Sequence, residues 1–218
     1  MSTKSELKEN ILAAKVEVLL QWILDNRSTA IMVFGTLVAG VLIMSVFLIR
    51  QNERRDMDWT RLAQAQIFLN NKQTVPSRQI FEEIRKKSPN TEAALYATYH
   101  LGEVDLEEKK YDDAIVHFSE AANTPRKHPL KPLALSNLGF AYEQKKEYKN
   151  AAETLQKYMD AYADHFLAPR VQLAIGRNWA LSGDTDAAKK TLSQLIDLYP
   201  TSEWAQNARL IMDKFISR

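Results

Sequence analysis

The chain lacks several of the residues and patterns on which catalytic and ligand sites are usually built. It has no cysteine, which excludes disulfides, thiolate metal sites and cysteine nucleophiles. Its six glycines form neither a phosphate-binding loop nor a nucleophile elbow. Its four histidines show no His-x-x-x-His pair, so no metal site is indicated. The sequence therefore predicts no enzyme, no metal or other cofactor and no small-molecule substrate.

An excess of charge is also missing. After residue 55 the Lys and Arg residues number 22 and the Asp and Glu residues number 22, so no basic surface for nucleic acid is expected. Apolar residues make up 45% of the 218 residues, and charged residues 26%. This composition is typical of a folded chain with one medium-sized domain. The absence of cysteine is compatible with either an oxidising or a reducing compartment.

One long uncharged stretch runs from Ala30 to Ile49, between Arg27 and Arg50. Its twenty residues would span roughly 30 Å as a helix, the thickness of a bilayer core. A buried core helix is one alternative. A cleaved signal peptide is another, but the stretch is too long for one and no small-x-small cleavage site follows it. We predict a single transmembrane helix over residues 28–50, followed by a linker over residues 51–57.

The flanking charges say little about membrane orientation. Near the helix, three Lys and Arg residues lie on its N-terminal side (Lys8, Lys15 and Arg27) and four on its C-terminal side (Arg50, Arg54, Arg55 and Arg61). The difference of one favours a cytoplasmic C-terminal domain. A bias of that size does not decide the topology.

Residues 1–27 show helical periodicity before this segment. An apolar stripe is formed by Leu7, Ile11, Ala14, Val18 and Trp22. We predict an amphipathic helix that lies at the membrane interface or against a partner's membrane helix. A short solvated helix leading into the anchor is the alternative.

Residues 58–218 contain a repeat. Similar segments begin at Leu101, Leu138 and Ile175, which gives a period of 37 residues held twice. One column holds small residues: Ala65, Gly102, Gly139 and Gly176. Twelve positions later a second small column reads Ser77, Ala114, Ala151 and Ala188, and four positions further a bulky column reads Phe81, Phe118, Leu155 and Leu192. We assign all three columns to packing between helices.

Other columns support the same period. An aromatic column reads Phe68, Tyr142 and Trp179, with Asp105 as its exception. Pro89, Pro125 and Pro200 are placed to end second helices. This pattern resembles the tetratricopeptide repeat, which implies an all-α fold: a right-handed solenoid of about four helical hairpins plus a C-terminal capping helix. Trp204, Ala208, Ile211 and Phe215 would form the apolar stripe of that cap.

If the fold is right, the binding surface is the concave face lined by the first helix of each hairpin. By register, the residues facing it are Tyr99, Glu103, Asn137, Phe140, Glu143, Arg177 and Ala180. Its aromatic and charged residues would suit an extended or helical peptide. An ordinary solvated helix face is the alternative for each of these residues.

The order of short N-terminal segment, single anchor and long-period repeats is similar to the bacterial ancillary SecYEG translocon subunit family. The resemblance implies a single-pass inner-membrane protein with a periplasmic repeat domain. It also implies an adaptor role, with the translocon, secreted substrates and chaperones as partners. The ending LYPTSEWAQNARLIMDKF resembles repeats of bacterial envelope proteins. The alternative is a scaffold subunit that contacts other subunits of a larger envelope complex.

Overall fold

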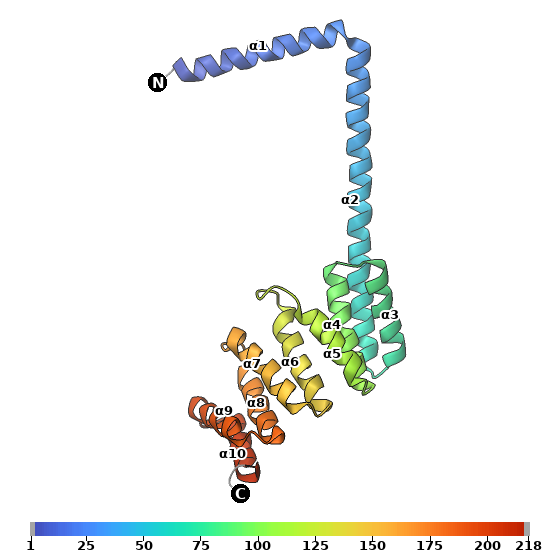
Figure 1. Ribbon diagram of the computed structural model, residues 1–218. Coiled ribbons are helices and arrows are strands. Elements are labelled where there is room, and N and C mark those ends of the chain that lie inside the picture. Colours follow the sequence, from blue (N-terminus) through green and yellow to red (C-terminus); the bar gives the residue numbers. More distant parts are fainter. Residues whose placement is uncertain (1–2, 216–218) are drawn as a thin grey trace. The chain divides into compact units, whose positions relative to one another are not determined.

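The computed structural model describes residues 3–215, with side chains from Ala14 onward, and the regular structure in that range is entirely helical. This confirms the predicted all-α class. The helices (Figure 1) are α1 (Thr3–Asp25), α2 (Arg27–Asn70), α3 (Thr74–Lys87), α4 (Glu92–Glu107), α5 (Tyr111–Ala122), α6 (Leu130–Gln144), α7 (Tyr148–Tyr162), α8 (Ala168–Ser182), α9 (Thr185–Leu198) and α10 (Glu203–Phe215).

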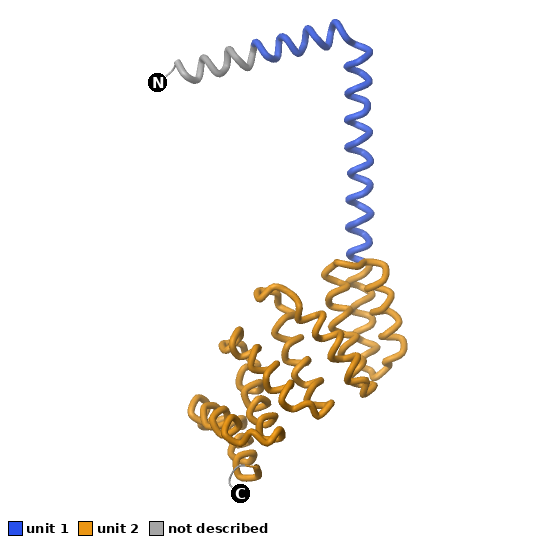
Figure 2. The backbone as a smooth tube through the Cα atoms, in the orientation of Figure 1, with its two compact units in different colours: residues 1–56 blue, residues 57–218 orange. Residues whose placement is uncertain are grey.

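The chain divides into two compact units, residues 1–56 (unit 1) and residues 57–218 (unit 2), as coloured in Figure 2. Helix α2 begins in unit 1 and ends in unit 2. The predicted linker, residues 51–57, is therefore helical, because it lies within α2. The division falls after Asp56, close to the predicted domain start at residue 58.

The described part of unit 1 leaves its large apolar side chains uncovered. In the part of the chain that the structure describes, α2 is the one helix long and apolar enough to cross a membrane. Ile31 and Phe34, within that stretch, are 72% and 70% exposed. A helix with such a surface is stable only if another apolar phase or partner covers it. Helix α2 is therefore a candidate membrane span.

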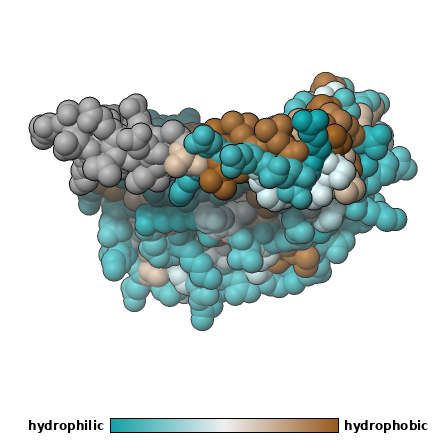
Figure 3. Space-filling view, turned by 90° about the horizontal axis from the view of Figure 1, so that it is seen from above, coloured by the Kyte–Doolittle hydropathy of each residue, from teal (hydrophilic) through white to brown (hydrophobic). Residues whose placement is uncertain are grey.

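Helix α1 also carries uncovered apolar residues. Val18 and Trp22 of the predicted stripe are exposed. The apolar surface of unit 1 is visible in brown in Figure 3. The side chains of Leu7 and Ile11 lie outside the described residues.

Unit 2 is a solenoid of helical hairpins. The hairpins are the C-terminal part of α2 with α3, α4 with α5, α6 with α7, and α8 with α9. Each helix from α3 to α9 packs against the next one in the chain, and α10 packs against both α8 and α9 (Figure 1). The predicted hairpins and C-terminal cap are thereby confirmed.

The spacing of small and bulky residues, which recurs in every repeat, explains how the two helices of each hairpin pack together. A Cβ atom built on Gly139 would lie 2.4 Å from Leu155 Cγ, and one on Gly102 would lie 2.8 Å from Phe118 Cε1. A carbon contact is normally 3.5–4.0 Å. The bulky residue of the second helix thus fills the space that the glycine leaves on the first. In the first hairpin Ala65 and Phe81 occupy these columns, and both are fully buried.

The turns inside the hairpins repeat with the same period. A residue with positive φ follows the first helix of each hairpin within two positions, at Lys72, Lys109, Lys146 and Gly183. The amide of Lys109 donates to the carbonyl of Leu106, and that of Lys110 to the carbonyl of Asp105. This pair of bonds is a Schellman motif, which needs a left-handed residue just after the helix. Three of the four turns place a lysine where glycine fits with less strain.

The three prolines predicted to end second helices also lie just after helix ends. Pro89 and Pro200 directly follow the C-cap residues of α3 and α9, and Pro125 follows that of α5 by two positions. Proline cannot continue a helix, because its ring replaces the backbone N–H and clashes with the preceding turn. The predicted ends of the second helices are thus confirmed at these three positions.

Candidate functional site

The first helices of the hairpins line two adjoining hollows in unit 2. The larger, about 580 Å³, is lined by Leu69, Asn70, Lys72, Glu103, Leu106, Glu107, Lys109, Tyr111, Asn137, Phe140, Gln144 and Arg170. The smaller, about 360 Å³, is lined by Ser136, Phe140, Glu143, Leu155, Arg170, Val171, Leu173, Ala174, Arg177, Trp204 and Asn207. Phe140 and Arg170 line both hollows. We therefore treat the two hollows as one surface and call it the groove.

Five predicted site residues line this groove. Glu103, Asn137 and Phe140 line the larger hollow, and Phe140, Glu143 and Arg177 line the smaller one. Phe140 is 40% exposed, which is high for a large apolar side chain in a packed repeat. The structure therefore brings these five residues to a common surface.

Tyr99 and Ala180 are placed differently from the prediction. Both are buried and neither lines the groove. Tyr99 packs in the core with Phe118, and its hydroxyl accepts a hydrogen bond of 2.8 Å from Asn137 Nδ2. Tyr99 thus acts through Asn137, whose amide it orients.

The Tyr99 hydroxyl is also kept neutral. Burial, together with the nearby Glu103 carboxylate, raises the pKa of Tyr99 well above its usual value. A neutral hydroxyl can accept from Asn137 and still donate its own proton. The predicted site residue therefore has a structural role behind the groove surface.

Every carboxylate that lines the groove already has a partner. Glu143 Oε2 accepts hydrogen bonds of 2.8 Å from both Arg177 and Asn178. Glu103 bonds to His100 Nδ1 at 2.6 Å, and Glu107 pairs with Lys72. Glu107 and Glu143 are thus ion-paired with Lys72 and Arg177, and Glu103 is hydrogen-bonded to a histidine.

Two cations of the groove have no such partner. Within residues 14–215, Arg170 and Lys109 form no ion pair or side-chain hydrogen bond, and both side chains line the larger hollow. Arg170 is exposed and lies in the first turn of α8. The groove lining holds four cations and three carboxylates, so its net charge is positive.

The groove lining also contains Arg170, Lys109 and Trp204, which the sequence pattern did not predict. Arg170 falls in a column whose other members are Trp59, Tyr96 and Leu133, so the repeat offers no signal for a charge there. Trp204 comes from the capping helix, which was assigned to packing alone. Lys109 lies in a turn, and only the folded backbone shows that its side chain reaches the groove.

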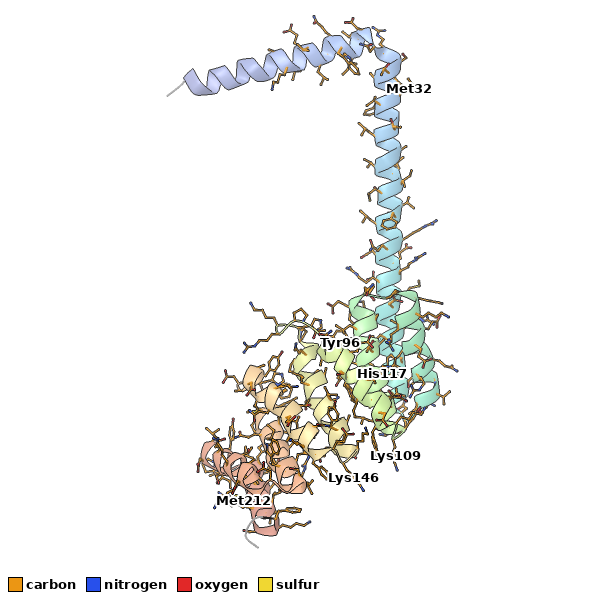
Figure 4. All side chains as sticks on the ribbon, viewed as in Figure 1. Met32, Tyr96, Lys109, His117, Lys146 and Met212 are labelled. Atoms are coloured by element: carbon orange, nitrogen blue, oxygen red, sulfur yellow. The ribbon has the colours of Figure 1, made fainter. Side chains whose placement is uncertain are left out.

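A second polar cluster lies away from the groove. Asp105 is fully buried, and its two carboxylate oxygens bond to Arg78 Nη2 and His117 Nδ1, each at 2.6 Å. Arg78 also bonds to Glu108 at 2.8 Å. A buried carboxylate is tolerated when both oxygens are paired in this way, which explains the exception in the aromatic column. Figure 4 labels His117 within unit 2.

Over the described residues, no group of three or more His, Asp or Glu side chains is placed to hold a metal ion. The groove offers an exposed aromatic ring, amides and fixed charges. Groups of this kind are common in protein-binding surfaces.

Comparison with known proteins supports the repeat assignment. A family model described as Tetratricopeptide repeat matches residues 133–165 and 170–202, two segments whose starts are 37 residues apart. No curated protein sequence matches the chain.

Solved structures share the fold. The apo form of RapI is 15% identical over 73% of this chain and 48% of its own, with a TM-score of 0.65. Aspartyl phosphate phosphatase F from Bacillus subtilis is 17% identical, over 74% and 46%, with a TM-score of 0.62. A putative kinesin light chain repeat protein from Podosopora anserina is 14% identical, over 72% and 91%, with a TM-score of 0.59. Identities this low show the fold alone, and together with the two matched segments they support a tetratricopeptide-like repeat fold for unit 2.

Proposed function

We propose that this chain is a membrane-anchored adaptor of the bacterial cell envelope that binds proteins in its groove. The observation that carries the proposal is the groove itself, where Phe140 stays exposed between two hollows lined by successive hairpins. An exposed aromatic ring beside hydrogen-bonding groups is a common anchor for a peptide. Stacked helical repeats generally support adaptor or scaffold roles rather than catalysis.

The membrane part of the proposal rests on α2. Its uncharged stretch leaves large apolar side chains exposed over about 30 Å, which suits the bilayer core. We propose a single-pass inner-membrane protein with unit 2 in the periplasm. The partners would then be the Sec translocon, secreted substrates and periplasmic chaperones, as in the family that the sequence resembles.

The same groove and anchor would also serve a scaffold subunit of a larger envelope complex. The exposed apolar side chains of α1, such as Val18 and Trp22, favour this second candidate, because a membrane helix of another subunit would cover them. The two candidates differ in their partners. An adaptor meets many substrates, whereas a scaffold has one fixed set.

Photo-crosslinking in cells tests the proposal. A photoreactive amino acid replaces Phe140 in the full chain, and another replaces Val116, an equally apolar residue that is 62% exposed on α5 outside the groove lining. Many secreted proteins and chaperones captured at position 140 alone would support the adaptor. A single stoichiometric partner would support the scaffold. Equal capture at both positions would reject the groove as the binding surface.

Topology needs a separate measurement. A reporter that is active only outside the cytoplasm is fused after Arg218. Activity of this reporter would support periplasmic placement of unit 2. If unit 2 is protected from added protease in intact spheroplasts, the periplasmic placement is wrong.

A further inference from the structure

We infer that the groove binds an acidic, extended segment of a partner protein, with Arg170 and Lys109 facing its carboxylates and Phe140 contacting an apolar side chain between them. The inference rests on the proposed function, since it names the chemistry of the bound segment. It starts from the charge of the groove lining. All three carboxylates there have a hydrogen-bond or ion-pair partner within the chain, whereas Arg170 and Lys109 have none among residues 14–215.

The position of Arg170 is unfavourable for the fold. It lies in the first turn of α8, where the helix dipole disfavours a positive charge. No carboxylate of the described chain offsets this, because Arg170 forms no ion pair there. A charge that does not stabilise its own helix and points into a groove is well suited to an anion from outside.

Apolar and polar groups next to Arg170 indicate what carries that anion. Phe140 lines both hollows together with Arg170, so an acidic residue and an apolar residue of one ligand can be bound side by side. Asn137 and Gln144 line the larger hollow and offer amides for the backbone of an extended chain. This combination fits a peptide better than an isolated anion or a lipid headgroup.

The positive φ of Lys109 allows a test in which glycine removes its side chain without straining the backbone. Its φ is 59°, and Lys146 has the same role in the next hairpin, with a φ of 67°. Figure 4 shows these two lysines at the turns of successive hairpins. Lys109 lines the groove and Lys146 does not. Glycine is less strained than lysine at both positions.

The experiment measures peptide binding by the full chain in phosphatidylcholine nanodiscs. The probe is a short fluorescein-labelled peptide of Glu, Leu, Gly and Ser, compared with a peptide in which Gln replaces each Glu. Fluorescence anisotropy gives the two affinities. We expect the Glu peptide to bind more tightly, with the difference shrinking as salt is added.

Matched variants locate the binding charge. Arg170→Gln should weaken binding of the Glu peptide about fivefold, the factor for one partly screened ion pair. Lys190→Gln, an exposed change on α9 outside the groove lining, should leave it unchanged. Lys109→Gly and Lys146→Gly should both raise the unfolding temperature by roughly 2 to 4 °C. Only Lys109→Gly should weaken binding, also about fivefold.

Several outcomes would overturn the inference. Equal affinity for the Glu and Gln peptides, no binding of either, or full binding by Arg170→Gln would each do so. The chain is also placed in nanodiscs that contain phosphatidylglycerol. If this lipid displaces the peptide, and the displacement depends on Arg170, the site is reassigned to anionic lipid. If Phe140 crosslinks proteins in cells but the Glu peptide has no advantage, the adaptor function stands and only the acidic specificity fails.

Discussion

Replacement of Gly139 by alanine tests whether the repeat columns are a packing device. In an ordinary helix interior this change stabilises, by about 1 kcal/mol, because alanine has the higher helix propensity. Here the new Cβ would lie 2.4 Å from Leu155 Cγ and 2.5 Å from Leu155 Cδ2. Leu155 is only 2% exposed and packs in the core with Tyr158 and Ile175, although one side of it lines the smaller hollow.

The expected magnitude follows from these two opposing effects. Forcing an extra carbon into a packed core costs about 1 to 3 kcal/mol, and contacts this short place the change near the upper end. Subtraction of the helix gain leaves a net loss of about 2 kcal/mol in the free energy of unfolding. Urea unfolding of the full chain in detergent, followed by circular dichroism, would measure it.

Two controls separate the clash from other effects. Leu155→Ala alone should cost about 2 to 5 kcal/mol through the cavity it leaves. Combined with Gly139→Ala it should cost less than the sum of the two single changes, because the alanine then fills part of that cavity. Gly40→Ala, whose Cβ meets no atom within 4 Å, should not destabilise the chain. A Gly139→Ala variant as stable as the wild type would refute the packing argument.

The remaining predictions concern polar groups of unit 2. Asp105→Ala removes a fully buried carboxylate and leaves Arg78, whose side chain is 22% exposed, with a partly uncompensated charge. It should lower the free energy of unfolding by about 3 kcal/mol, measured by the same urea titration. Burial raises the pKa of the Tyr158 hydroxyl to about 12. The unfolded chain then loses this proton first, near pH 10, so stability should fall as the pH rises from 10 towards 12. Tyr158→Phe should make that fall shallower, and an unchanged slope would contradict the assignment. Lys146→Gly should add about 1 kcal/mol of stability by relieving the left-handed backbone, and a loss would show that the lysine side chain stabilises its turn.

Much of the fold could be predicted because the repeat imposes the same packing problem on each hairpin. Gly102 faces Phe118 in one hairpin and Gly139 faces Leu155 in the next, and the spacing of each pair is visible in the sequence. The uncharged stretch of α2 could be recognised in the same way, because length and lack of charge are local properties. The groove was predicted in part, since helix register alone brings Phe140 and Glu143 to the same side of α6.

Only the tertiary structure decided which polar groups stay free. Tyr99 is buried because Phe118 and Asn137, from later helices, cover it. Asp105 is tolerated in a column of aromatics because Arg78, from the preceding hairpin, reaches its carboxylate. The sequence by itself determined the helices, their repeat period and the face that each helix packs against its neighbours. These features depend on residues that are close along the chain. The free charge of Arg170 depends on residues distant in sequence, and its exposure in the groove follows only once the hairpins stack.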